Sequence, residues 1–213
     1  MSDLEKLHEA VIEGDWKAAA AVTRAAIAAG VAPLAIVTGC LVPAMDEVGR
    51  RFDCEEYFVP EMLLSARAMK ASMEIVRPLL AATGAEPVGR VVIGTVKGDL
   101  HDIGKNLVAS MLEGGGFEVI DLGADVAPAR FIEAAATRNA NLVALSALLT
   151  VTMPSMKTTV DAFRSAGLRE TVKIMVGGAP VTQQYADAIG ADGYSDSAGG
   201  AVALARRLVC ASS

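Results

Sequence analysis

The chain of 213 residues contains two histidines, and one of them, His101, lies two residues after an aspartate. The carboxylate of Asp99 is close enough in sequence to accept the proton of one ring nitrogen of His101 and so to fix its tautomer. The other ring nitrogen is then free to act as a base or as a metal ligand. One histidine without further ligands makes a poor zinc site, whereas an axial bond to a metal already held in a macrocycle needs only one.

The segments around this pair predict that it follows a β-strand. Residues 90–96 form a short β-branched run, and residues 103–113 have the pattern of a helix. Further strands are expected at residues 117–122, 141–145, 172–176 and 193–195, and helices at 128–138, 153–166, 181–188 and 198–209. This alternation predicts an α/β fold, a doubly wound, flavodoxin-like sheet of five parallel strands. Its common order, 2-1-3-4-5, places a ligand crevice at the carboxyl ends of strands one and three.

The loop after the third predicted strand is therefore expected to face the loop that contains His101. It reads Ser-Ala-Leu-Leu-Thr from Ser146 to Thr150. The hydroxyl of Ser146 could extend the hydrogen-bonded line beyond Asp99.

The first 80 residues have a different pattern, with helical periodicity and no convincing strand. Helices are expected at residues 4–13, 15–29 with Asp15 as N-cap, from Pro33 onward, and 60–80. Residues 83–89 have the composition of a linker. We therefore expect two domains, a helical bundle over residues 1–85 and the sheet domain over residues 86–213.

Composition excludes several classes of protein. The net charge of −6 and the pI near 5.0 argue against a nucleic-acid surface. No charge occurs between Arg24 and Asp46, but glycines and prolines interrupt this stretch, so we expect soluble helices and no membrane partner. The three cysteines match neither a disulfide framework nor zinc spacing, and the N-terminus lacks a signal core; both favour the cytoplasm.

Common catalytic motifs do not account for the histidine loop. The sequence from Gly98 to Lys105 resembles a phosphate loop, but five residues instead of four separate its glycines, and Asn106 replaces the expected Ser or Thr. The dinucleotide motif G-x-G-x-x-G and the hydrolase motif G-x-S-x-G are both absent from the sequence.

A resemblance to a known family is specific at this point. Three motifs follow the order of the base-off cobalamin-binding domain: Asp99-x-His101-x-x-Gly104, Ser146-x-Leu148 and Gly177-Gly178. Forty-one residues separate the first from the second and twenty-eight the second from the third, nearly as in that domain. Residues 94–108, GTVKGDLHDIGKNLV, look like methionine synthase and corrinoid methyl carriers, and residues 45–69 resemble the helical cap that precedes the domain. The whole chain is most similar to stand-alone corrinoid proteins of methylamine, methanol or O-demethylase systems.

The resemblance implies a role for each matching residue. His101 would be the lower axial cobalt ligand and would displace the dimethylbenzimidazole of cobalamin. Asp99 would hydrogen-bond to His101, and Ser146 to Asp99. The remaining implied cofactor contacts, most of them along the displaced nucleotide tail, are Ile103, Gly104, Leu148, Thr150, Gly177 and Gly178.

The resemblance extends to the cap. Phe52 and Val59 match the positions that shield the upper face of the cobalt. The sequence departs from the family pattern at Glu55, where a glycine is usual, so the turn between the two shielding positions is expected to differ in shape or stiffness.

The implied function is to carry a methyl group on cobalt, without a catalytic residue of its own. A substrate-specific methyltransferase would load the methyl group, and a second methyltransferase would pass it to folate or coenzyme M. The resemblance also allows a third partner, a protein that reductively activates the corrinoid. Two alternatives share parts of the pattern: a cobalamin-dependent sensor, which would need a DNA-binding module that this sequence lacks, and a mutase small subunit, which lacks the cap.

Overall fold

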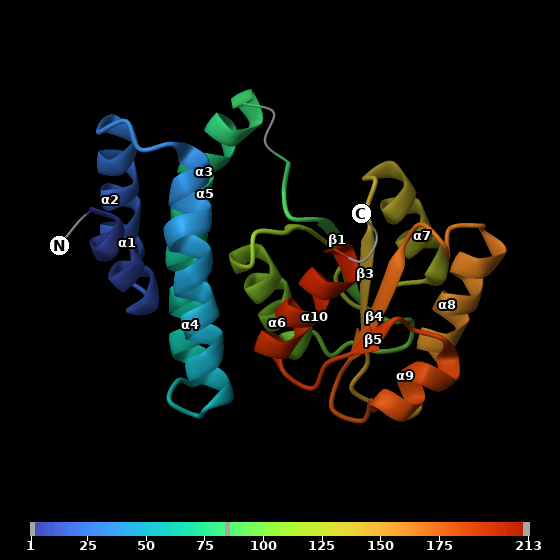
Figure 1. The fold of residues 1–213 in the computed structure, drawn as a ribbon. Helices are drawn as coiled ribbons and strands as arrows, with labels where there is room; N and C mark the ends of the chain where they lie inside the picture. Colours follow the sequence, from blue (N-terminus) through green and yellow to red (C-terminus); the bar gives the residue numbers. More distant parts are fainter. Residues whose placement is uncertain (1–2, 84–85, 211–213) are drawn as a thin grey trace. The chain divides into compact units, whose positions relative to one another are not determined.

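The computed structural model describes residues 3–83 and 86–210 of the chain. The chain divides into two compact units: the first extends to Pro87 and also includes Glu113–Gly116, and the second begins at Val88 and contains the rest of the chain. The first unit is helical and the second contains a sheet with helices on both faces (Figure 1).

The helical unit contains the helices that the sequence predicts, with bounds close to those expected. They are α1 (Asp3–Ile12), α2 (Trp16–Ala28), α3 (Pro33–Ile36), the π-helical turn η1 (Val37–Leu41), α4 (Val42–Asp53) and α5 (Val59–Thr83). Asp15 is the N-cap of α2, as predicted, because its Oδ1 accepts the amide protons of Lys17 at 3.1 Å and Ala18 at 3.0 Å. Long apolar side chains fill the interior of this unit, among them Leu7, Leu41, Met45, Met62 and Met69. Over the described residues, no helix has the length and apolar character that a membrane crossing requires.

The turn between α4 and α5 is held by charged and aromatic side chains. Glu47 forms ion pairs with Arg50 and Arg51 at 2.8 Å each, and these hydrogen bonds lower the pKa of Glu47 to about 2. Arg50 also reaches Glu56 at 3.0 Å. Arg51 donates a hydrogen bond to the Tyr57 hydroxyl at 3.0 Å and lies over its ring. Ion pairs and a hydrogen bond between side chains therefore stabilise the turn between Phe52 and Val59, the predicted shielding residues.

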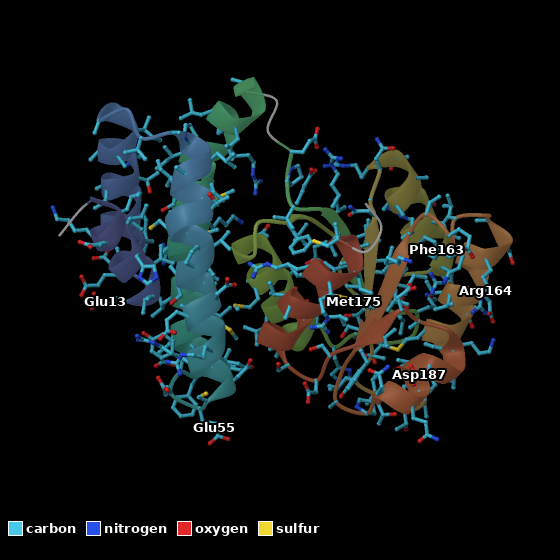
Figure 2. The ribbon with its side chains drawn as sticks, in the orientation of Figure 1. Glu13, Glu55, Phe163, Arg164, Met175 and Asp187 are labelled. Atoms are coloured by element: carbon cyan, nitrogen blue, oxygen red, sulfur yellow. The ribbon has the colours of Figure 1, made fainter. Side chains whose placement is uncertain are left out.

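Glu55 lies in this turn with a φ of +59°, in the left-handed region that glycine adopts most easily. Its side chain projects from the turn away from the helices (Figure 2). The glutamate that replaces the usual glycine of the family therefore has a Cβ at a position where the backbone conformation favours glycine.

Replacing Glu55 with glycine is expected to stabilise the protein by about 0.5–1 kcal/mol, because the left-handed penalty exceeds the added freedom of the unfolded chain. Chemical denaturation of the full chain measures the change. Glu55→Ala is the control, since it removes the carboxylate but keeps the Cβ. An equal gain from both variants would show that charge, and not backbone conformation, limits the turn.

The second unit contains one sheet of five parallel strands in the order β2-β1-β3-β4-β5, as predicted. Each bound lies within one residue of the expected one: β1 (Arg90–Thr95), β2 (Glu118–Asp121), β3 (Leu142–Ser146), β4 (Lys173–Gly177) and β5 (Gly193–Tyr194). Its helices are α6 (Ile103–Gly114), α7 (Pro128–Thr137), α8 (Pro154–Ser165), α9 (Gln183–Ile189) and α10 (Ala198–Cys210). Helices α6 and α10 cover one face and α7, α8 and α9 the other (Figure 1), so the fold is doubly wound.

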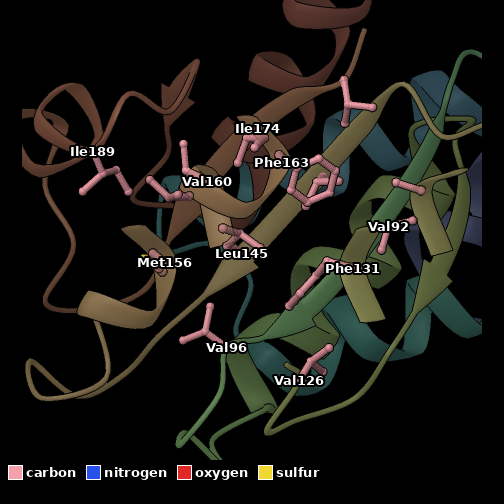
Figure 3. Packing of buried hydrophobic residues seen from close by; sticks show 14 of the residues in the cluster. Val92, Val96, Val126, Phe131, Leu145, Met156, Val160, Phe163, Ile174 and Ile189 are labelled. Carbon is pink, nitrogen blue, oxygen red and sulfur yellow. The ribbon is translucent and has the colours of Figure 1, made fainter. Parts of the chain in front are cut away.

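Buried β-branched and aromatic side chains join the sheet to its helices. Val92 and Ile174 of the strands pack with Phe131 of α7 and Phe163 of α8, and all four side chains are fully buried (Figure 3). Near-continuous apolar runs are typical of parallel strands that are buried on both faces. Because those runs are unambiguous here, the strands could be located from the sequence.

The strand register determines which loops meet. Thr95 at the end of β1 pairs with Ser146 at the end of β3, and Ser146 pairs with Gly177 at the end of β4. The three strands end level with one another, so the loops that leave them start side by side at the carboxyl edge.

Candidate functional site

His101 and Asp99 form a directly hydrogen-bonded pair in the loop after β1. The distance from His101 Nδ1 to Asp99 Oδ1 is 2.7 Å, and the same oxygen accepts the amide proton of His101 at 3.0 Å. The Asp99 side chain is fully buried, whereas the imidazole is 50% exposed. When Nδ1 donates its proton to the carboxylate, Nε2 carries the lone pair that a metal ion can accept.

The second carboxylate oxygen of Asp99 binds the loop after β3. Asp99 Oδ2 accepts hydrogen bonds from the amides of Leu148 at 2.8 Å and Leu149 at 3.3 Å, and from the hydroxyl of Thr152 at 2.7 Å. Burial alone would raise the pKa of Asp99, but the hydrogen bonds from Thr152, His101 and Leu148 outweigh it and lower the pKa below its usual value. The buried carboxylate is therefore ionised and joins the histidine loop to the β3 loop.

The hydroxyl donor to Asp99 differs from our expectation. The resemblance implies Ser146, but among the residues that the structure describes the hydroxyl bonded to Asp99 is that of Thr152. Ser146 is the last residue of β3, and its carbonyl oxygen accepts the amide proton of Val96 at 3.0 Å. The chain turns after the strand, and this turn brings the side chain six residues later back to Asp99.

Replacing Thr152 with valine is expected to destabilise the apoprotein by about 1.5–3 kcal/mol, because it removes a hydrogen bond to a buried charge while preserving shape. Denaturant unfolding measures the loss. Thr152→Ser keeps the hydroxyl and should recover most of it, and Ser146→Ala should change stability by less than about 0.5 kcal/mol. A larger effect at Ser146 than at Thr152 would contradict this arrangement.

A second contact that the sequence did not reveal joins the histidine loop to the end of β1. The hydroxyl of Thr95, fully buried at the end of β1, donates a hydrogen bond to the carbonyl oxygen of His101 at 2.9 Å. A threonine at the end of a strand is the only signal in the sequence for this role. The backbone of the histidine is thus held from β1 as well as by Asp99.

Large apolar side chains of the histidine loop, of the first residue of α6 and of the loop after β3 are unusually exposed. Leu100 is 76% exposed, Ile103 78% and Val151 80%. Leu148 and Leu149, whose amides bind Asp99, are 43% and 41% exposed. An exposed apolar surface that carries one available imidazole nitrogen fits a flat macrocyclic metal complex. A free metal ion fits less well, since the described residues contain no group of three or more His, Cys, Asp or Glu that could hold one.

The paired glycines have different surroundings. Gly178 has a φ of +129°, and a Cβ there would overlap the carbonyl oxygen of Ala147. A Cβ at Gly177 would lie 3.1 Å from the carbonyl oxygen of Ser195. The fold itself therefore requires glycine at Gly178, independently of any contact with the nucleotide tail.

Of the remaining predicted cofactor contacts, Thr150 and Gly104 lie on the same edge of the sheet. Thr150 is exposed in the turn after β3, and Gly104 is exposed in the first turn of α6, where a Cβ would meet open space. Phe52 and Val59 lie in the other unit, at the last-but-one residue of α4 and the first residue of α5. Phe52 is half-buried and Val59 is 37% exposed.

Comparison with known proteins agrees with this geometry. Residues 89–203 match a family described as B12 binding domain, and residues 3–77 match a second family with the same description. The trimethylamine corrinoid protein 1 of Methanosarcina acetivorans is 41% identical over 208 residues, which cover 97% of this chain and 96% of the relative. The trimethylamine corrinoid protein 2 of Methanosarcina mazei is 44% identical and covers 94% and 93%. The chain belongs to the family of cobalamin-binding corrinoid proteins.

Solved structures of the corrinoid-protein family share the fold. A cobalamin-binding protein from Desulfitobacterium hafniense DCB-2 is 34% identical, with a TM-score of 0.80 and coverage of 98% of this chain and 99% of that one. The methanol:cobalamin methyltransferase complex MtaBC of Methanosarcina barkeri contains a chain that is 29% identical, with a TM-score of 0.86 and coverage of 98% and 80%. As a member of this family, the protein binds cobalamin or a related corrinoid.

Proposed function

We propose that this corrinoid protein carries a methyl group on cobalt from a substrate-specific methyltransferase to a second methyltransferase, which delivers it to folate or coenzyme M. The observation that carries the proposal is the Asp99–His101 pair, held at 2.7 Å with the imidazole half exposed among apolar side chains. The names of the relatives, which are corrinoid proteins for trimethylamine and dimethylamine, support methyl transfer. The MtaBC complex supports a methyltransferase partner.

Each residue of the site has a role in this proposal. His101 Nε2 would be the lower axial ligand, and Asp99 would fix the tautomer and direction of the ring. When bound, the corrinoid supplies a cobalt centre that accepts and releases the methyl group. Along the nucleotide tail and the lower face of the corrinoid, the chain would offer Ile103, Gly104, Leu148, Thr150, Gly177 and Gly178. Ser146 would contribute through its strand-end position and not through a bond to Asp99.

The helical unit would serve as the cap. Phe52 and Val59 would shield the upper face of the cobalt from water, and the braced turn between them supports a fixed spacing of the two side chains. The boundary between the domains would lie at residues 85–86, close to the start of the second compact unit at Val88. A rigid-body movement of the cap about the linker at residues 83–89 would give each partner methyltransferase access to the cobalt in turn.

The proposal also places the protein in the cytoplasm, together with its partner methyltransferases and a reductive-activation protein. The cysteines support a reducing compartment, because Cys40, Cys54 and Cys210 are all free.

Methyl loading of the reconstituted protein tests the proposal. The apoprotein is loaded with hydroxocobalamin, reduced, and incubated with ¹⁴C-labelled trimethylamine, dimethylamine, monomethylamine or methanol, each with the methyltransferase of a relative that uses it. At least one combination is expected to transfer label to the protein-bound corrinoid. If the relative's own corrinoid protein accepts label in every assay and this protein in none, the proposal is wrong.

A further inference from the structure

The loop between β2 and α7 contacts the histidine loop through Asp125. One carboxylate oxygen of Asp125 accepts the amide proton of Gly98 at 2.8 Å, and the other pairs with Lys97 Nζ at 3.0 Å. In return, the amide of Asp125 donates a hydrogen bond to the carbonyl oxygen of Asp99 at 2.9 Å. One residue thus binds three successive residues, Lys97, Gly98 and Asp99, the last of which lies two positions before His101.

The backbone at both partners has an uncommon conformation. Asp125 has a φ of +55° and Gly98 a φ of +88°. Aspartate is one of the few residues other than glycine that adopt the left-handed region readily. The hydrogen bond from Gly98, followed by the pairing with Lys97, lowers the pKa of Asp125, so its carboxylate is ionised. Backbone contacts continue on either side, with Val96 bridged to Val126 and the amide of Thr95 bonded to Gly123 at 2.9 Å.

A second aspartate of the same region holds the far end of the histidine loop. Asp121, the last residue of β2, pairs with Lys105 in the first turn of α6, and its Oδ1 lies 2.6 Å from Lys105 Nζ. The Lys105 side chain is 1% exposed and also donates to Asn106 Oδ1 at 2.6 Å. The segment from Lys97 to Lys105 is therefore attached at both ends to the chain that leaves β2.

We propose that Asp125 is a positioning residue for the axial ligand: by accepting the amide proton of Gly98 and donating to the carbonyl of Asp99, it sets the Asp99–His101 pair in the direction that ligation requires. The inference rests on the proposed role of His101 as cobalt ligand. The acceptor oxygen does the positioning, whereas the ion pair with Lys97 contributes little, because both side chains are substantially exposed, 58% and 41%.

The local conformation allows a matched set of variants. Asp125→Gly and Asp125→Asn both tolerate the left-handed backbone, but only asparagine keeps an acceptor for Gly98. Lys97→Met removes the ion pair alone. Asn139→Gly is the control, since Asn139 is also left-handed, with a φ of +50°, and lies just before β3, at the opposite end of the sheet.

The readout is the electron paramagnetic resonance spectrum of the full chain loaded with cob(II)alamin, after labelling of the histidines with ¹⁵N. Axial imidazole gives nitrogen splitting that changes from a triplet to a doublet on labelling. Asp125→Gly is expected to lower the nitrogen-split fraction at least fivefold and to raise the dissociation constant for cobalamin about 10-fold, as for other groups that orient a metal ligand. Asp125→Asn, Lys97→Met and Asn139→Gly should stay within twofold of the parent protein.

Two outcomes would overturn the inference. One is a full signal split by the ¹⁵N-labelled histidine in Asp125→Gly, even if the melting temperature of this variant falls. Asp125 would then have a structural role only. The other is loss of the signal in folded Asp125→Asn, which remains informative if the glycine variant does not fold. A parent protein without histidine splitting would instead refute the proposed role of His101, so the two failures are distinguishable.

Discussion

Replacing His101 with alanine is expected to give a folded protein whose bound cob(II)alamin has no nitrogen splitting from a protein imidazole, and whose methyl transfer is at least 10-fold slower. The fold should survive because the ring is half exposed and contributes no core packing. Asp99 would keep the amide of residue 101, the amides of Leu148 and Leu149 and the hydroxyl of Thr152. The loss of stability in the apoprotein should therefore be about 1–2 kcal/mol, less than for a buried hydrogen bond to a charge, because the ring is half exposed.

The second histidine provides the matched control. His8 lies in α1, in the helical unit, so His8→Ala removes an imidazole without touching the loop after β1. It should leave the spectrum and the transfer rate unchanged. Retention of ¹⁵N-sensitive splitting in His101→Ala, or its loss in His8→Ala, would contradict the assignment of the axial ligand.

The strands of this protein could be predicted because local pattern and tertiary environment agree. Runs such as Arg90–Thr95 and Leu142–Ser146 are apolar and bounded by turn residues, and a doubly wound sheet buries such strands on both faces. The Asp99–His101 pair could be predicted for a related reason. The two residues are so close in sequence that a short loop brings them together.

The contacts that sequence reasoning missed depend on how the chain returns to the site. Thr152 reaches Asp99 only because the loop after β3 turns back, and the spacing to Ser146 does not reveal this. The amides of Leu148 and Leu149 bind Asp99 with their backbone, which leaves no mark on residue type. Asp125 lies 26 residues after Asp99, and the contact exists because β2 runs beside β1.

The two glycines at the end of β4 are expected to separate a requirement of the fold from a requirement of the ligand. Gly178→Ala should destabilise the apoprotein by about 3 kcal/mol or more. Its φ of +129° is a region that only glycine adopts readily, and the added Cβ would overlap the carbonyl oxygen of Ala147. Loss of cobalamin from this variant would therefore say nothing about the path of the nucleotide tail.

Gly177→Ala is the informative change for the tail. The new Cβ would lie 3.1 Å from the carbonyl oxygen of Ser195, a contact that a small shift relieves, so the apoprotein should lose about 1 kcal/mol or less. If the nucleotide tail passes Gly177, the side chain of the introduced alanine would occupy the space of the tail. The dissociation constant for cobalamin should then rise at least 10-fold. Equilibrium dialysis and denaturant unfolding of the same preparation measure the two effects. Gly39→Ala in the helical unit, where an added Cβ meets open space, should change neither. Parent-like affinity in Gly177→Ala would place the tail elsewhere, because the side chain would then stand where no ligand passes.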